Sequence, residues 1–241
     1  MKTLVIVPTY NERENVESIV GGILEWTAPD VAVLIVDDAS PDGTGELADA
    51  LSRAHPARVF VLHRAGKMGL GSAYLSGFRF GIERGFGAVC EMDADGSHDP
   101  SALPKLIAAV EGGADLAIGS RRVAGGEVVG WGPHRHLMSG GAMTLSRIAL
   151  GLKTRDVTSG FRCYRAELAA ELLQLPIVSN GYAFQEETAF YAERLGYRVV
   201  ELPIVFRDRL RGTSKLTWRE VAQFFTIIGK LRRVKIPPRK K

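Results

Sequence analysis

Five short, uninterrupted apolar runs alternate with amphipathic stretches through the first half of the chain. The runs lie at 3–7, 31–36, 58–62, 87–92 and 114–119, and helical patterns separate them at 14–26, 44–53, 71–84 and 101–111. Continuous apolar runs of this length are typical of strands that are buried on both faces. Their alternation with helices predicts an α/β fold, with a mostly parallel central sheet flanked by helices.

The regular alternation ends after residue 119. Gly-rich and basic loops fill much of 120–160, and the later elements are predicted as helices at 138–150, 165–173 and 183–195 and a strand at 199–206. No repeat, low-complexity block or linker divides the chain, so we expect a single domain over residues 1–241.

A last helix is predicted to begin at Thr217, where Thr217 and Glu220 form a capping box. Its apolar stripe consists of Val221, Phe224, Phe225 and Ile228. Basic residues crowd its end, where the helix dipole favours them, and these are Lys230, Arg232, Arg233 and Lys235. The stripe fits either packing on the body of the protein or contact with a membrane.

Charge is distributed unevenly along the chain. The whole chain has 31 Lys and Arg against 27 Asp and Glu, yet the segment from Arg207 to Lys241 alone carries 12 basic and 2 acidic residues. An acidic body with a basic C-terminal segment indicates an anionic partner at one end. The segment has no recognised nucleic-acid motif and the acidic body would repel a duplex, so we expect no nucleic-acid partner.

Composition and hydropathy exclude several classes of protein. An apolar content of 46% excludes a disordered or collagen-like chain. The two cysteines, Cys90 and Cys163, form no CxxC pair, which disfavours a disulfide scaffold or zinc site and suits a reducing compartment. No secretory signal is visible, and no apolar stretch approaches the ~18 residues that span a bilayer. We therefore expect no transmembrane span.

Carboxylates, an aromatic side chain and an arginine follow the predicted strands. The four segments are PTYNE at 8–12, DDASPDGT from Asp37, DADGSHDP from Asp93 and GSRR with Arg121. Ligands of open parallel sheets bind beyond the carboxyl ends of the strands, so we expect these segments to converge. GxGxxG is missing after the first strand, and KMGLGSAY at 67–74 lacks the GK[ST] ending. Both absences disfavour NAD, FAD and P-loop nucleotide enzymes.

The strongest local signal is Asp93-Ala94-Asp95, which follows an apolar strand. Two carboxylates at i and i+2 on an extended segment point the same way and suit one hard divalent cation. Mg²⁺ or Mn²⁺ held in this way keeps open positions for substrate phosphates. A DxD sequence alone is a weak signal, but it becomes specific beside the other strand-end segments.

Taken together, these motifs resemble the dolichol-phosphate and polyprenol-phosphate mannosyltransferases, which are inverting nucleotide-sugar glycosyltransferases with the GT-A fold. The resemblance spans nearly the whole chain in order, through VPTYNERENV, VDDASPDGT, KMGLGSAY, MDADGSHDP, GSRR, TSGFRCYR, FQEE and FRDRLRGTSKLT. It implies a GDP-mannose donor, a polyprenyl monophosphate acceptor and Mg²⁺ or Mn²⁺. It also implies a nucleotide-sugar-binding half at 1–120, an acceptor-side half at 121–216 and a basic amphipathic helix and tail at 217–241.

The resemblance assigns site residues by position. Those implied to surround the nucleotide sugar are Pro8, Tyr10, Glu12, Val36, Asp38, Asp93, Ala94, Asp95, Arg121, Arg209 and Lys215. For Pro8 and Val36, packing within the strands is the alternative role, and it is compatible with a contact between their backbone and the nucleotide. The metal ligands would be Asp93, Asp95 and Ser97. The catalytic set would be Asp95, Arg121, Arg209 and Lys215, with the two late basic residues near substrate phosphates. For Arg121, the alternative role is a surface ion pair.

Some positions depart from the family pattern or invite a simpler explanation. Relatives often carry Arg and Asn where this chain has Gly140 and Met143, although Arg135 keeps a nearby basic position. We expect His98 to form a hydrogen bond with the backbone of its own loop, and Cys163 to be a buried structural thiol.

Two other functions stay open at the level of sequence. One is a related transferase that uses UDP-glucose or another nucleotide sugar on polyprenyl phosphate. The other is a non-catalytic nucleotide-sugar-binding subunit, which would not need to retain both phosphate-binding clusters. A lipid acceptor implies a cytoplasmic protein placed peripherally at the cytoplasmic face of a membrane, with a separate membrane-anchoring protein as a possible partner.

Overall fold

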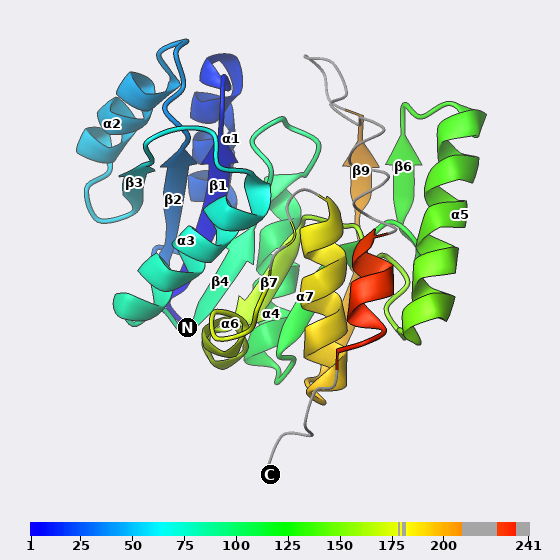
Figure 1. Cartoon of the computed structure of the whole chain (residues 1–241). Helices are drawn as coiled ribbons and strands as arrows, with labels where there is room; N and C mark the ends of the chain where they lie inside the picture. Colours follow the sequence, from blue (N-terminus) through cyan, green and yellow to red (C-terminus); the bar gives the residue numbers. More distant parts are fainter. Residues whose placement is uncertain (178, 180–181, 209–225, 235–241) are drawn as a thin grey trace.

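A computed structural model of the protein describes residues 1–177, 179, 182–208 and 226–234. Its centre is a seven-stranded sheet with the strand order β3-β2-β1-β4-β7-β5-β8 (Figure 1). The strands are β1 (Thr3–Thr9), β2 (Val31–Asp37), β3 (Val59–His63), β4 (Ala88–Glu91), β5 (Leu116–Ser120), β7 (Arg162–Arg165) and β8 (Val199–Pro203). The five strands predicted from the apolar runs are confirmed as β1 to β5, with ends that differ by at most two residues.

The sheet is parallel except at β7. Strands β1, β2, β3 and β4 pair in parallel, and β5 pairs in parallel with β8. Strand β7 runs antiparallel between β4 and β5, so that Arg162 lies opposite both Glu91 and Ile118. Its first residue therefore lies at the edge where the parallel strands end. Sequence reasoning missed β7, because RCYR is four residues long and carries an arginine at each end.

Helices cover both faces of the sheet (Figure 1). They are α1 (Arg13–Trp26), α2 (Thr44–Ala54), α3 (Leu70–Glu83), the 3-10 helix η1 (Pro100–Ala102), α4 (Leu103–Glu111), α5 (Pro133–Leu150), α6 (Ala166–Leu172) and α7 (Tyr182–Arg194). Side chains alternate along each strand, so Leu4 and Ile6 face α3, α6 and α7, whereas Val5 and Val7 face α1, α2 and α4. The seven helices predicted between residues 14 and 195 are confirmed, although α5 begins five residues earlier than expected because Pro133 fits the first turn of a helix.

A second, two-stranded parallel sheet lies beside α5 and consists of β6 (Glu127–Val129) and β9 (Val205–Arg207). The single strand predicted at 199–206 is thus two strands, β8 and β9. Ile204 passes the chain from one sheet to the other, since its amide donates to Ser120 and its carbonyl accepts from Glu127. Pro203 has no amide hydrogen with which to continue the first ladder.

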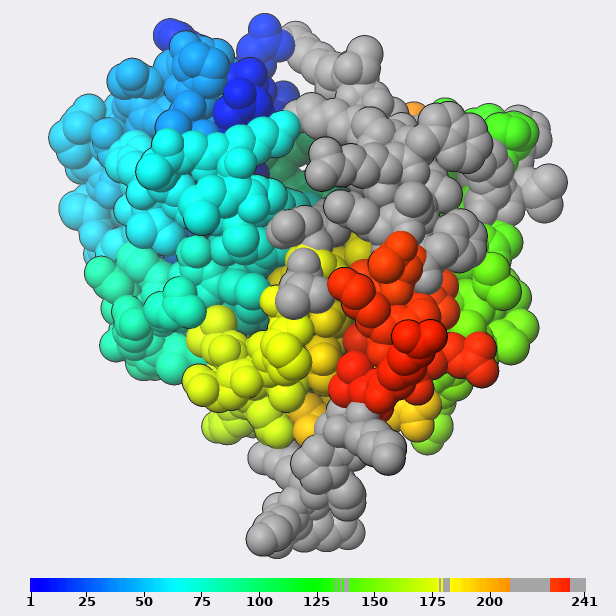
Figure 2. All heavy atoms as spheres, in the orientation of Figure 1, coloured from blue at the N-terminus to red at the C-terminus, as the bar shows by residue number. Residues whose placement is uncertain are grey.

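Residues 226–231 are helical and belong to the same core cluster as α7. Figure 2 shows this segment, in red, on the surface beside the yellow segment. Ile227, Ile228 and Leu231 are buried in the core there. The packing alternative for the apolar stripe is therefore confirmed at Ile228. Thr217, Glu220, Val221, Phe224 and Phe225 lie outside the described residues. Within the described part of the chain, no helix combines the length and the apolar character needed to cross a bilayer.

Candidate active site

The first two strand-end segments lie side by side, because Pro8 is the register partner of Val36. The Val36 side chain is fully buried in the core, and Pro8 is half-buried. Strand packing, the alternative considered for these two residues, is thus confirmed for the Val36 side chain. Beyond β1, Tyr10 is half-buried and Lys67 places its ammonium 4.5 Å from the centre of the Tyr10 ring. Glu12 accepts a 2.8 Å hydrogen bond from Asn15 at the start of α1.

Asp38 holds the loop that joins β3 to α3. Its Oδ1 lies 2.5 Å from the Arg64 guanidinium, and its Oδ2 accepts from the Met68 amide at 3.3 Å. Both side chains of the Asp38–Arg64 pair are nearly buried. The side chain expected at the nucleotide therefore also fixes the loop that carries Lys67 to Tyr10.

Asp93 and Asp95 lie directly beyond β4. Ala94, between them, is buried, whereas both carboxylates are half-buried. The segment was expected to be extended, but Ala94 and Asp95 form a turn that Gly96 completes with a φ of 74°. Such a φ suits glycine, which lacks the Cβ that makes it costly. The orientation of the carboxylates is set by hydrogen bonds instead, since Tyr74 donates to Asp93 at 3.1 Å and the Ser97 amide donates to Asp95 at 3.1 Å.

The donor atoms at this turn fit a divalent cation. No group of three or more His, Cys, Asp or Glu side chains suited to a metal occurs within the described ranges. Mg²⁺ commonly uses one or two carboxylates and takes its remaining ligands from substrate phosphates and water, so Asp93 and Asp95 suffice. The Ser97 hydroxyl is buried and has no hydrogen-bond partner in the described structure. An unpaired buried hydroxyl beside two carboxylates is consistent with the predicted third ligand.

His98 is hydrogen-bonded to the start of this turn. Its Nδ1 accepts a hydrogen bond from the Asp93 amide at 3.3 Å, and its ring stacks on Phe161 with centroids 4.9 Å apart. Burial lowers the pKa of His98 to about 4, so the ring is neutral at physiological pH. The expected backbone hydrogen bond is confirmed, and this neutral ring leaves Nδ1 as an acceptor.

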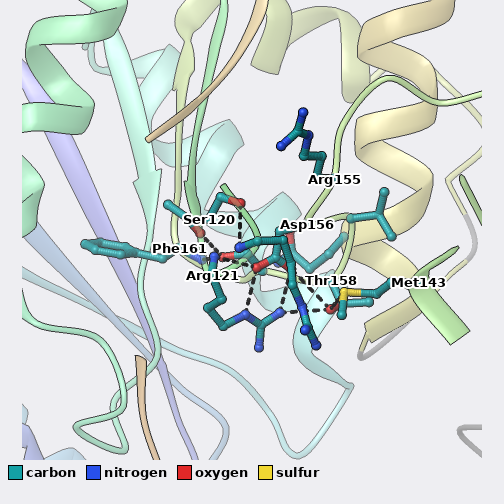
Figure 3. Close-up of polar contacts among 12 residues, drawn as sticks. Ser120, Arg121, Met143, Arg155, Asp156, Thr158 and Phe161 are labelled. Carbon is teal, nitrogen blue, oxygen red and sulfur yellow. Dashed lines mark hydrogen bonds and ion pairs between the residues drawn. The ribbon is translucent and has the colours of Figure 1, made fainter. Parts of the chain in front are cut away.

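Arg121 follows β5 and forms a buried ion pair with Asp156 (Figure 3). Its Nε and Nη2 donate to the two carboxylate oxygens at 2.7 and 2.6 Å, and its amide donates to Oδ2 at 2.9 Å. Nη2 also donates to the Thr158 hydroxyl at 2.9 Å. The guanidinium carbon lies 5.1 Å from the centre of the Phe206 ring. The alternative of an ion pair holds in this structure, but the pair is buried rather than superficial.

The loop that carries Asp156 is itself held by carboxylates of neighbouring elements. The amides of Arg155 and Asp156 donate to Glu201 of β8 at 2.8 and 2.9 Å. Glu193 of α7 accepts from the amide and hydroxyl of Thr154. Asp156 was missed at the level of sequence, because a lone Asp in a Gly- and Arg-rich stretch carries no spacing signal.

A second cluster of buried polar side chains lies near Asp93 and includes Glu91 and Arg162. Glu91 is fully buried at the end of β4 and accepts from Gln185 of the FQEE segment at 2.8 Å. Arg162 is also fully buried, and donates to the carbonyls of Val157, Ser159 and Gln185 and to the Thr188 hydroxyl. The signal that could have revealed this cluster is Glu91 itself, a carboxylate inside an apolar strand pattern.

The remaining predicted residues have mixed outcomes. Cys163 is a buried free thiol opposite Cys90, as expected. Met143 is buried and its sulfur accepts from Thr158 at 3.3 Å, which links α5 to the Arg121 network. Arg209 and Lys215 lie outside the described residues, so their predicted roles stay predictions.

Comparison with known proteins identifies relatives over most of the chain. Polyprenol monophosphomannose synthase of Mycolicibacterium smegmatis is 49% identical over 222 residues, which cover 92% of this chain and 83% of that protein. Undecaprenyl-phosphate mannosyltransferase of Micrococcus luteus is 48% identical over 217 residues, covering 90% and 88% respectively. The resemblance found in the motifs is confirmed by these relatives.

Solved structures with a similar fold include two nucleotide-sugar enzymes. The mannosyltransferase PcManGT of Pyrobaculum calidifontis, in complex with GDP-Man and Mn²⁺, has a TM-score of 0.66 at 20% identity, over 98% of this chain and 66% of that one. Glucosyl-3-phosphoglycerate synthase of Mycobacterium tuberculosis, in complex with Mn²⁺, UDP-glucose and phosphoglyceric acid, has a TM-score of 0.69 at 20% identity, over 95% and 80%. These likenesses concern the fold.

The expected GT-A architecture is thereby confirmed, and the enzyme class follows from the family. The profile of glycosyl transferase family 2 matches residues 4–173, which include every described strand-end segment from Pro8 to Asp156. The chain therefore belongs to glycosyl transferase family 2 and is a glycosyltransferase with the GT-A fold.

Proposed function

We propose that the enzyme transfers mannose from GDP-mannose to a polyprenyl monophosphate, with inversion at the sugar carbon and with Mg²⁺ or Mn²⁺. The observation that carries the proposal is the 49% and 48% identity, over about nine-tenths of the chain, to enzymes named for mannose and a polyprenyl phosphate. The two carboxylates beyond β4 and the cationic groups beyond β5 give this chemistry its binding groups.

The acceptor needs no dedicated general base in this reaction. A phosphate monoester has a second pKa of about 6, so its attacking oxygen is largely ionised at neutral pH. His98 is neutral, but it is buried under the turn and its Nδ1 is already engaged with the Asp93 amide. The protein therefore acts by aligning the two substrates and by compensating their negative charge.

Each side chain of the turn has a defined part in this scheme. Asp93, Asp95 and Ser97 would hold the cation, which supplies Lewis-acid stabilisation of the departing nucleoside diphosphate when bound. Tyr74 orients Asp93, and the Ser97 amide orients Asp95. Arg121, held by Asp156, faces the same edge of the sheet, and Arg209 and Lys215 are assigned to the substrate phosphates by the family pattern.

Because the proposed acceptor is a membrane lipid, the proposal includes a peripheral location of the enzyme at a cytoplasmic leaflet. In support, Lys230, Arg232 and Arg233 are all exposed, at and just after the end of the helical turn that packs on the body. Basic residues near an anionic leaflet contribute about 1 kcal/mol each to binding. A separate membrane-anchoring protein is compatible with the same surface.

The decisive experiment supplies the purified protein with polyprenyl phosphate and a panel of radiolabelled nucleotide sugars. We expect label in the lipid fraction with GDP-mannose, and far less with UDP-glucose, UDP-galactose or GDP-glucose. Stereochemistry is checked by NMR of the product, which should have the anomeric configuration opposite to that of the donor. Preferential labelling from UDP-glucose would overturn the choice of donor while leaving the reaction class intact.

A further inference from the structure

Three arginines surround one buried carboxylate where β5 and β7 meet the edge of the sheet. Asp156 is fully buried, and burial acts to raise its pKa. The hydrogen bonds and charge of Arg121 outweigh burial, Arg162 adds to them, and the net result is a lowered pKa. Asp156 is therefore ionised, and one negative charge faces the positive charges of Arg121, Arg122 and Arg162.

Two of these arginines are held by several hydrogen bonds within the protein. Arg121 is bound bidentately by Asp156 and also donates to Thr158. Arg162 donates to three backbone carbonyls and to Thr188. Within the cluster, the one carboxylate of Asp156 therefore serves three guanidinium groups.

Arg122 differs from the other two, because its side chain has no hydrogen bond to the described part of the chain. Its amide donates to the Ser120 hydroxyl, but its Nε is buried without a hydrogen-bond partner among the described residues. Its guanidinium lies beside α5, where a Cβ built on Gly140 would be 3.9 Å from Nη1. The glycine leaves room for this side chain next to the helix. Burial lowers the pKa of Arg122, Arg121 lowers it further and Asp156 acts in the opposite direction.

A buried donor without a partner and an uncompensated positive charge are both unfavourable in the absence of a ligand. An anion would satisfy both at once, since guanidinium groups bind phosphate oxygens through paired N–H donors. We propose that Arg122 binds a phosphate group of a substrate, next to Arg121, whose charge Asp156 largely compensates. This inference rests on the proposed function and adds a residue that the family motifs do not assign.

The phosphate has two possible sources in the proposed reaction. One is the diphosphate of the nucleotide sugar, and the other is the monophosphate head of the lipid acceptor. Arg122 lies at the start of the predicted acceptor-side half, beside α5, whereas Asp93 and Asp95 follow β4 in the predicted nucleotide-sugar-binding half. The two ligands can be measured separately, so the experiment has one arm for each.

The experiment measures binding by the whole protein rather than turnover. GDP with Mn²⁺ serves as the nucleotide probe, and farnesyl phosphate serves as a detergent-compatible prenyl monophosphate. Both are titrated calorimetrically into wild type, Arg122→Gln, Arg122→Lys and the matched control Arg155→Gln. Arg155 lies on the neighbouring loop, is exposed, and points away from the Arg121–Asp156 pair in Figure 3.

Arg122→Gln should weaken binding of one of the two probes by about tenfold to a hundredfold, which is the usual effect of losing a charge-assisted hydrogen bond. Arg122→Lys should recover part of that loss, because it restores the charge without the guanidinium geometry. Arg155→Gln should bind both probes like wild type. The probe that is affected identifies the source of the phosphate.

Equal affinities of Arg122→Gln and wild type for both probes would overturn the inference and leave the proposed function standing. An equal loss in Arg155→Gln would also overturn it, because the effect would then be long-range electrostatics rather than a contact. If wild type itself binds neither probe, the proposed function fails, and the inference fails with it. Thermal melting of each variant verifies that the fold is retained.

Discussion

The side-chain amide of Gln185 on α7 donates a 2.8 Å hydrogen bond to Glu91 at the end of β4, two residues before Asp93. This bond ties a helix from the second half of the chain to the strand that carries the candidate metal ligands. Glu91 is fully buried, and burial raises its pKa to about 8, against the opposing effect of Arg162. At neutral pH the Glu91 carboxyl is therefore mostly protonated, so the site carries less negative charge than its number of carboxyl groups indicates.

A protonated Glu91 makes stability depend on pH. The side chain of the folded protein keeps its proton between about pH 4.5 and 8, where the unfolded chain has released it. The free energy of unfolding therefore falls as pH rises through this window, by about 1.4 kcal/mol per unit for one group. Glu186 has a pKa raised to about 8 by burial and by Glu187, and it adds a similar slope.

Replacing Glu91 by Gln should remove its share of this slope, because glutamine mimics the protonated acid and does not titrate. Urea unfolding followed by circular dichroism between about pH 5 and 8 measures the difference. Glu186→Gln is the comparison variant and should remove the other share. A slope in Glu91→Gln as steep as that of wild type would show that Glu91 is ionised in the folded protein.

Breaking the buried ion pair should be costly for the fold. Asp156→Asn removes the carboxylate that binds the nearly buried Arg121 guanidinium bidentately, and we expect a loss of about 3 kcal/mol in the free energy of unfolding. Asp49→Asn is the matched control, because Asp49 pairs with His63 at a site where both side chains are about half exposed. That variant should lose less than about 1 kcal/mol. Comparable losses in the two variants would contradict the structural importance assigned to Asp156.

Transfer should depend on a divalent cation through the turn after β4. Chelation should abolish activity, and Mg²⁺ or Mn²⁺ should restore it. Asp95→Asn should keep the fold and lose most of the activity at any metal concentration. Full activity of Asp95→Asn in the presence of chelator would reject the metal site.

Ser97 offers a finer test of the same turn. Its hydroxyl is buried and has no partner among the residues that the structure describes, so Ser97→Ala should leave the free energy of unfolding nearly unchanged. If the hydroxyl coordinates the metal, the concentration of Mn²⁺ required for half-maximal activity should rise several-fold. The matched variant Ser101→Ala, on η1, should leave that concentration unchanged. Identical metal dependence in wild type and Ser97→Ala would remove Ser97 from the ligand set.

Much of the fold could be predicted because β1 to β5 are continuous apolar runs and the helices between them have clear periodicity. Strand β7 could not, since four residues ending in arginines show neither signal, and its antiparallel insertion depends on pairing partners distant in sequence. The division of the predicted strand into β8 and β9 at Ile204 could not be predicted either, because an apolar residue fits a strand of either sheet. Tertiary pairing decided both cases.

The residues of the candidate site also fall into those that could be predicted from the sequence and those that could not. Asp93 and Asp95 stand out because they follow a strand, and the family motif assigns Arg121. Asp156 and Arg122 could not be found, because their importance arises from the number of charges around one buried carboxylate. Such a balance of charge appears only when residues from β5, β7 and the loop before β7 are brought together.

The basic C-terminal segment should favour membrane binding without taking part in phosphate chemistry. Lys230, Arg232 and Arg233 are exposed, whereas Ile227 and Leu231 of the same turn are buried against the body. Replacing the three cations by Gln should weaken binding to vesicles that contain anionic lipid by about a hundredfold, at about 1 kcal/mol for each charge. Lys235, outside the described residues, can be added to the set. Sedimentation with vesicles measures the change.

The same triple variant should separate lipid access from turnover. Its apparent KM for a long-chain acceptor in vesicles should rise, because less enzyme reaches the surface that holds the substrate. Its activity on a short, detergent-soluble acceptor should stay close to wild type, whereas replacing Arg209 or Lys215 should depress turnover with either acceptor. A control that neutralises Lys2, Arg53 and Lys105, which are exposed elsewhere on the molecule, removes the same charge. Equal loss of vesicle binding in the control would mean that net charge, rather than the C-terminal surface, governs the approach to the membrane.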